Sequence, residues 1–202
     1  MKKLAIMAIL ATAALAASAA DISAVVKYDY DNASNAGTTV AANRSVVGLK
    51  YTLDGQLGAV DAGLANSRIS LGNTTVNGVG YDVGYSNGVK LGAVGVNGRV
   101  GYTTYDIASI AGQHVSANAI SYAAEVTYPL NSTFTAFAGV ENLRGAVVAG
   151  PVTQYASANR YTIGTDIAVS KNTALRVGYA RVDANGTGVV TNGLTTAFSY
   201  KF

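Results

Sequence analysis

The chain has 202 residues and a formal net charge of +3, and it contains 23 glycines, 13 tyrosines, no cysteine and no tryptophan, with only 12% charged residues. The absence of cysteine excludes a disulfide scaffold, a thiolate metal site and a cysteine nucleophile. The length suits one domain with a sizeable core or one closed barrel, and the abundance of Gly, Tyr, Thr and Val is typical of β-strands.

Residues 1–20 have the pattern of a secretory signal peptide. Lys2 and Lys3 form a short positive region, residues 4–15 are almost continuously apolar, and small residues follow at 17–20. The apolar run is short for a transmembrane helix, which needs about 20 such residues. We expect cleavage after Ala19 or Ala20, which leaves one domain over 21–202. Twelve basic residues then remain against 11 acidic ones, so we expect no nucleic-acid partner.

From residue 22 onward, apolar and polar residues alternate, which predicts β-strands with one apolar face. In the first segment Val26, Tyr28 and Tyr30 share one parity, while Lys27 and Asp29 share the other. The same pattern recurs at 47–53, 81–93, 120–128, 161–169 and 175–179.

Short turns and longer polar stretches alternate between these segments. Turn-forming residues predict short turns at 54–55, 129–132 and 170–172, with a fourth at either 86–88 or 95–98. Five stretches rich in small polar residues are predicted to be long loops: 32–43, 66–77, 107–117, 144–157 and 184–192. This organisation gives ten strands of about ten residues each, with eight strands as the alternative.

Two all-β architectures accept such a series of strands. A soluble sandwich would have a richly charged outer face and loops of similar character at both ends. A transmembrane antiparallel up-and-down β-barrel has short turns at one end and long loops at the other, and the asymmetry here favours it. Tyrosines near the strand ends suit an interfacial girdle. Isolated charges on the parity opposite the apolar stripe are predicted to line the barrel interior and to pair with one another: Lys27, Asp29, Lys50, Asp82, Arg99, Glu125, Asp166, Arg176 and Lys201.

The chain ends in an alternating strand, "TTAFSYKF". A barrel in hydrocarbon must pair its last strand with its first, because an unpaired backbone group there costs several kcal/mol. Phe198, Tyr200 and Phe202 resemble the C-terminal signal that the barrel-assembly machinery recognises in bacterial outer-membrane barrels. The segments "RVGYTTYD" (99–106) and "LRVGYARVD" (175–183) resemble strands of the opacity-protein and OmpA-like small-barrel superfamily.

This resemblance implies location in the bacterial outer membrane, with outer-membrane lipid and the assembly machinery as partners. No peptidoglycan-binding domain follows the barrel segment, so cell-wall tethering is not expected. Association with further copies or with other envelope proteins stays open, because the loops have few charges and aromatics.

Catalytic and metal-binding patterns are weak. The only histidine is His114, with Ser116 two residues on, and a nucleophile activated by a base needs more than these two residues. The carboxylates lack the spacing of a calcium loop. We therefore expect no enzymatic activity and no cofactor. The predicted function is a structural or surface-interaction role for a barrel with a polar, plugged interior and five extracellular loops, and the alternative is a narrow passive pore for ions or very small solutes.

Overall fold

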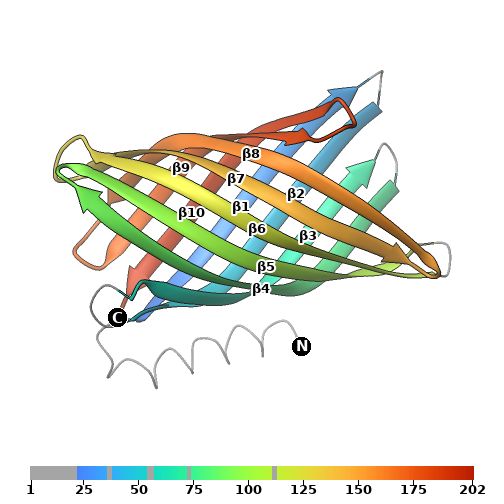
Figure 1. Cartoon of the computed structure of the whole chain (residues 1–202), viewed down its shortest axis with the longest axis horizontal. Helices are drawn as coiled ribbons and strands as arrows, with labels where there is room; N and C mark the ends of the chain where they lie inside the picture. The colour runs from blue at the N-terminus through green and yellow to red at the C-terminus, as the bar shows by residue number, and fades with distance from the viewer. Residues whose placement is uncertain (1–21, 36–37, 54–56, 72–73, 111–112) are drawn as a thin grey trace.

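The protein forms one closed barrel of ten antiparallel strands (Figure 1). The structure is a computed structural model that describes residues 22–35, 38–53, 57–71, 74–110 and 113–202. The strands are β1 (Ile22–Asn35), β2 (Thr38–Thr52), β3 (Ala59–Leu71), β4 (Thr74–Leu91), β5 (Val94–Ile110), β6 (Gln113–Pro129), β7 (Phe134–Ala149), β8 (Val152–Ala168), β9 (Thr173–Ala184) and β10 (Val189–Lys201). The predicted all-β, up-and-down, ten-stranded architecture is confirmed. The predicted signal peptide lies outside the described residues.

Each strand pairs with its neighbours in chain order, and β10 returns to β1. The closing pair runs from Ser23 opposite Lys201 to Asn32 opposite Asn192. The backbone N–H of Phe202 donates to the carbonyl of Ile22 at 3.1 Å, so pairing continues to the last residue. No helix within the described residues is long and apolar enough to cross a membrane.

The two ends of the barrel differ, and we name them by their connections. The turn end holds the connections β2–β3, β4–β5, β6–β7 and β8–β9, together with the C-terminus, and the hairpin end holds the other five connections (Figure 1). The chain turns between β6 and β7 at 130–133 and between β8 and β9 at 169–172. The turn predicted at 54–55 lies outside the described residues.

Both positions predicted for the turn between β4 and β5, 86–88 and 95–98, are wrong. Residues 86–88 pair directly with 97–99 as strand, and the chain turns between Leu91 and its partner Val94. Gly92 has a φ of +65°, the left-handed conformation that a two-residue hairpin favours at its first central position. The apolar parity that runs through residue 87 therefore marks a continuous strand.

The five long loops predicted from the sequence are also wrong. Apart from residues outside the described ranges, these stretches are mostly paired strand: β7 and β8 pair as far as Ala149 opposite Val152, and β9 and β10 as far as Ala184 opposite Val189. Strands therefore have 12 to 18 residues. A 17-residue strand tilted by about 40° rises roughly 40 Å, more than the apolar band of about 25 Å in a membrane barrel.

The barrel exterior changes character along its length. Toward the turn end the outward side chains are large and apolar and strongly exposed, for example Tyr81 (63%), Ile163 (62%) and Leu194 (58%). Toward the hairpin end the outward positions become polar. Eight strands each place one outward asparagine at this transition, and we call this set the asparagine collar: Asn32, Asn43, Asn66, Asn77, Asn118, Asn142, Asn159 and Asn192.

The interior changes in the opposite sense at the same transition. Inward positions near the hairpin end include the buried Val115 and the half-buried Ile107, whereas inward positions nearer the turn end carry most of the interior charges. Small polar residues on the outward face gave the sequence of these hairpins the composition of loops. The inward residues of the same hairpins are mostly apolar. The alternation of a strand therefore continues there with its polarity reversed: polar side chains face outward and apolar ones face inward.

Deleting Phe202 should reduce the amount of assembled barrel far more than it reduces the stability of the molecules that fold. The lost ring and one backbone hydrogen bond cost about 2 kcal/mol by burial area, which a closed barrel should survive, whereas recognition of a terminal signal can fail completely. The matched control is Phe134→Ala, an outward phenylalanine at the same end with 40% exposure. Pulse-chase fractionation with heat-modifiable gel migration separates the two effects, and normal assembly of the Phe202 deletion would contradict the signal.

Candidate functional site: the charged barrel interior

Inward-facing charges gather in the barrel interior because strand alternation sends every second side chain there. Twelve of them line two adjoining cavities: Lys27, Asp29, Arg44, Lys50, Asp61, Asp82, Arg99, Glu125, Glu141, Arg160, Asp166 and Arg176. Six are basic and six acidic, so the set is formally neutral. Charges removed from water are tolerated when they are paired and hydrogen-bonded, and most of these charges form three ion clusters.

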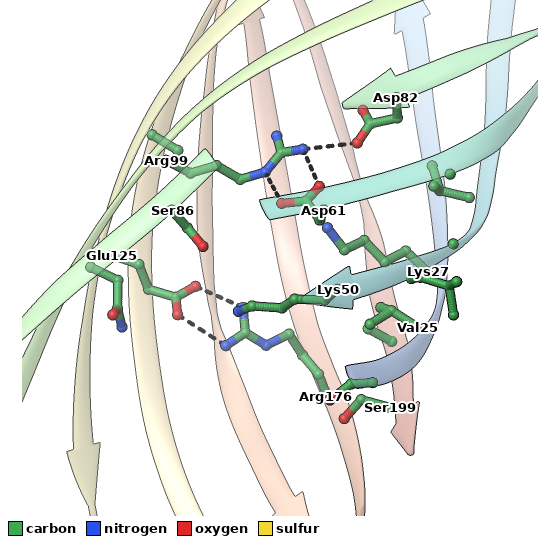
Figure 2. A pocket seen from close by; sticks show the side chains of 18 of the residues that line it. Val25, Lys27, Lys50, Asp61, Asp82, Ser86, Arg99, Glu125, Arg176 and Ser199 are labelled. Carbon is green, nitrogen blue, oxygen red and sulfur yellow. Dashed lines mark hydrogen bonds and ion pairs between the residues drawn. The ribbon is translucent and has the colours of Figure 1, made fainter. Parts of the chain in front are cut away.

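The first cluster joins strands β2, β3, β4 and β5. Arg99 donates from Nη2 to Asp61 Oδ2 at 2.7 Å and to Asp82 Oδ1 at 2.8 Å (Figure 2). The second oxygen of Asp82 accepts from Arg44 and, at 2.7 Å, from the hydroxyl of Thr103. Asp82 is only 3% exposed, so its charge is balanced almost entirely by these donors.

Glycine makes room for the central arginine of this cluster. A Cβ atom added at Gly84 or at Gly101 would collide with the Arg99 guanidinium. The planar head of Arg99 therefore lies against bare backbone on two neighbouring strands, which explains the glycines at these inward positions.

The second cluster ties β1 to β8. Arg160 holds the Asp29 carboxylate with two hydrogen bonds of 2.6 and 3.1 Å, and Thr195 on β10 donates to the same carboxylate at 2.6 Å. Asp29 is 7% exposed. Strands β9 and β10 lie between β8 and β1 in the barrel, so this ion pair crosses part of the interior instead of following the wall.

The third cluster is centred on Arg176 of β9. Its guanidinium donates to Glu125 of β6 at 2.7 and 3.0 Å (Figure 2). It also donates to Asp166 of β8 at 2.6 and 2.8 Å. The same group stacks over the ring of Phe137, 4.1 Å from its centroid, as a cation–π contact. The Phe137 ring is 3% exposed and lies against Gly164 and Gly178.

The residues predicted from the sequence are distributed unevenly over these clusters. Asp29, Asp82, Arg99, Glu125, Asp166 and Arg176 belong to them. Lys27 and Lys50 line the larger cavity (Figure 2) and make no direct ion pair with another described residue. Lys201 lies opposite Ser23 at the turn end and lines neither cavity.

Four interior charges were missed by sequence reasoning: Arg44, Asp61, Glu141 and Arg160. Arg160 is the partner of Asp29, although the two are separated by 131 residues. Each of the four lies on the inward parity of its strand. All four lie outside both the predicted alternating segments and the predicted loops, so following the alternation along the whole of each strand would have found them.

The first and third clusters lie where the two cavities meet. The larger cavity, about 630 Å³, includes Ser23, Lys50 and Ser199 near the turn end. The smaller, about 180 Å³, includes Asp29, Arg44 and Arg160 farther in. Both are lined by residues of the first and third clusters, so these side chains separate one space from the other.

The lone histidine lies away from this interior. His114 Nε2 and Asp106 Oδ1 are 2.8 Å apart, and both side chains are more than 70% exposed on the outward parity near the hairpin end. Among the described residues there is no group of three or more histidine, cysteine or carboxylate side chains that could hold a metal ion.

Comparison with known proteins identifies the fold. Neither a protein-family model nor a curated protein sequence matches this chain. An outer membrane channel from Pseudomonas putida F1 is similar in structure, with a TM-score of 0.60 and 11% identity over 91% of this chain and 96% of that one. The β domain of the Bordetella autotransporter BrkA gives 0.56, with 13% identity over 90% and 99% of the chains. The translocator domain of the autotransporter NalP from Neisseria meningitidis gives 0.52, with 11% identity over 100% and 98%. The chain thus has the β-barrel fold of outer-membrane proteins.

Reversing one member of the buried Asp29–Arg160 pair should be strongly destabilising. Arg160→Glu places two carboxylates together in the interior, and we expect a loss of about 3–5 kcal/mol. Combining it with Asp29→Arg should restore a large part, because the pair is re-formed with exchanged charges.

The matched control is Arg181→Glu, which reverses an exposed pair with Asp183 and should change the stability far less than Arg160→Glu does, because solvent screens the exposed pair. Urea unfolding of the refolded barrel, followed by gel migration, measures the unaltered protein, the two single variants Arg160→Glu and Asp29→Arg, the double variant and the control. If the double variant is no more stable than the sum of its single changes predicts, the two residues do not act as a pair.

Proposed function

We infer that the protein is an integral protein of the bacterial outer membrane with a structural or surface-interaction role, closed by its own ion clusters and without enzymatic activity. In this proposal the hairpin end faces outward from the cell. The observation that carries the proposal is the set of ion pairs between non-neighbouring strands in the barrel interior. Kinship with the opacity-protein and OmpA-like barrels is part of the proposal, supported by Phe198, Tyr200 and Phe202 on the outward face of the closing strand.

The exterior supports a membrane environment. Soluble proteins rarely expose a continuous apolar surface as large as the outward face of this barrel. Here the apolar side chains face outward and most of the charged ones face the interior. Tyrosine hydroxyls at the margins of the apolar surface reach polar partners: Tyr179 donates to Asn192 at 2.7 Å toward the hairpin end, and Tyr85 donates to the Leu57 carbonyl at 2.9 Å toward the turn end. Rings in the apolar zone with hydroxyls directed away from its centre are typical of interfacial girdles.

The interior supports a closed barrel. Asp29–Arg160 spans from β1 to β8, and Glu125–Arg176 spans from β6 to β9. Eight strands leave an interior just filled by side chains, so ten strands leave little more. Two-point arginine–carboxylate contacts fix these side chains in place, and solutes would have to break them to pass.

A narrow pore is the second candidate, and the cavities favour it. The two spaces of about 630 and 180 Å³ adjoin at the clusters. A rearrangement of the Arg99 or Arg176 side chain would connect them. An ion path would then run along a lining that carries charges of both signs.

Conductance decides between the two candidates. Purified protein in a planar bilayer should show no stable open channel, whereas Asp29→Ala combined with Arg160→Ala should raise the conductance, since it removes a crossing pair without leaving one charge unpaired. The control is Arg181→Ala with Asp183→Ala, which removes an exterior pair and should leave the interior closed. A steady open channel in the unaltered protein would contradict the closed barrel and favour the pore.

A further inference from the structure

The asparagine collar forms a nearly continuous polar belt outside the barrel. Residues directly opposite each other in a sheet share one face, and the register sets Asn32 opposite Asn192 and Asn142 opposite Asn159. The amide of Asn142 donates from Nδ2 to Asn159 Oδ1 at 2.7 Å. The amide oxygens of four collar residues accept hydrogen bonds within the protein: Asn43, Asn142, Asn159 and Asn192. The other four make no side-chain hydrogen bond with another described residue, so their donors and acceptors can bind hydroxyl groups: Asn32, Asn66, Asn77 and Asn118.

Two arginines in this belt have donors to spare. Arg68 is exposed and lies between Asn43 and Asn77 on the neighbouring strands, and it makes no hydrogen bond or ion pair with another described residue. Arg144 donates from Nε to Asn142 Oδ1 at 3.0 Å. Its terminal nitrogens have no partner in the part of the chain that the structure describes.

The carboxylates near the collar are already engaged. Asp183 accepts from Arg181 at 2.9 Å, and Asp106 lies 2.8 Å from His114. Arg181 balances the charge of Asp183. Asp106 lies on β5, two strands away from both Arg68 on β3 and Arg144 on β7, so neither carboxylate adjoins the two arginines.

The surface next to the collar is apolar. On β1 the outward position beside Asn32 is Tyr30, and on β8 the positions beside Asn159 are Tyr161 and then Ile163. A ligand that covers both surfaces is an amphiphile, with acyl chains against the apolar surface and a polar headgroup at the collar. Guanidinium groups match phosphate, and the amides match hydroxyl groups.

We propose that the asparagine collar, with Arg68 and Arg144, binds the headgroups of a phosphorylated glycolipid in the outer leaflet. A sugar headgroup with several hydroxyls and phosphates matches the collar amides and two arginines with unused donors better than a phospholipid headgroup does, because a phospholipid offers one phosphate and few hydroxyls. The inference rests on the proposed function, which places the hairpin end on the outer side of the membrane.

The test is glycolipid retention by the purified, full-length mature barrel. The protein is refolded in detergent, exposed to rough-type lipopolysaccharide, phosphatidylglycerol or inorganic phosphate, and analysed by native mass spectrometry. Lipopolysaccharide should remain bound in preference to phosphatidylglycerol. Arg68→Gln combined with Arg144→Gln should weaken its retention about tenfold, and Arg68→Lys with Arg144→Lys should recover part of it. The matched control is Lys171→Gln, an exposed cation at the turn end, which should leave retention unchanged.

Equal retention of phosphatidylglycerol, displacement by inorganic phosphate alone, or no effect of the double arginine variant would each overturn the proposal. Heat-modifiable gel migration and insertion into vesicles are measured on the same samples. A barrel that folds and inserts but retains no glycolipid disproves this inference alone, whereas a barrel that does not insert into bilayers contradicts the proposed function itself.

Discussion

Backbone hydrogen bonding between β1 and β10 is the constraint on which the other features of this barrel depend. Closure leaves no sheet edge in the circle of strands, and Phe202 extends the pairing to the last residue. Once the circle is closed, the register of each strand determines which side chains face inward, because a slip of one residue would turn every side chain to the other face. Inside and outside are therefore defined for all ten strands together.

The closed circle explains the selection of residues in the interior. A charged side chain directed inward can reach a partner only across the lumen or on an adjacent strand, and Arg176 does both through Glu125 and Asp166. Bulky groups also need space, which Gly84 and Gly101 provide beneath Arg99. Breaking such a buried pair is costly because it leaves one charge without compensation, so the clusters maintain the shape of the barrel as well as closing it.

The sequence could predict what depends on neighbouring residues. Alternation in the segment 22–30 identified a strand and its two faces, and the C-terminal aromatic stripe indicated closure. It could not predict that Asp29 pairs with Arg160, because contact between β1 and β8 follows from the circumference of the barrel. The stretches 144–157 and 184–192 have the composition of loops because they are rich in small residues, above all Gly, Ala and Thr, and long paired hairpins can have the same composition.

The reversal of polarity at the asparagine collar requires a membrane around one part of the barrel and water around the other. Labelling of single cysteines on intact cells with an impermeant reagent tests this arrangement. We expect reaction at Pro151→Cys and Thr187→Cys on the hairpin end and none at Val140→Cys in the apolar belt, with Lys171→Cys on the turn end reacting only after the cells are permeabilised. Reaction at position 140 on intact cells, or at 171 in place of 151 and 187, would contradict it.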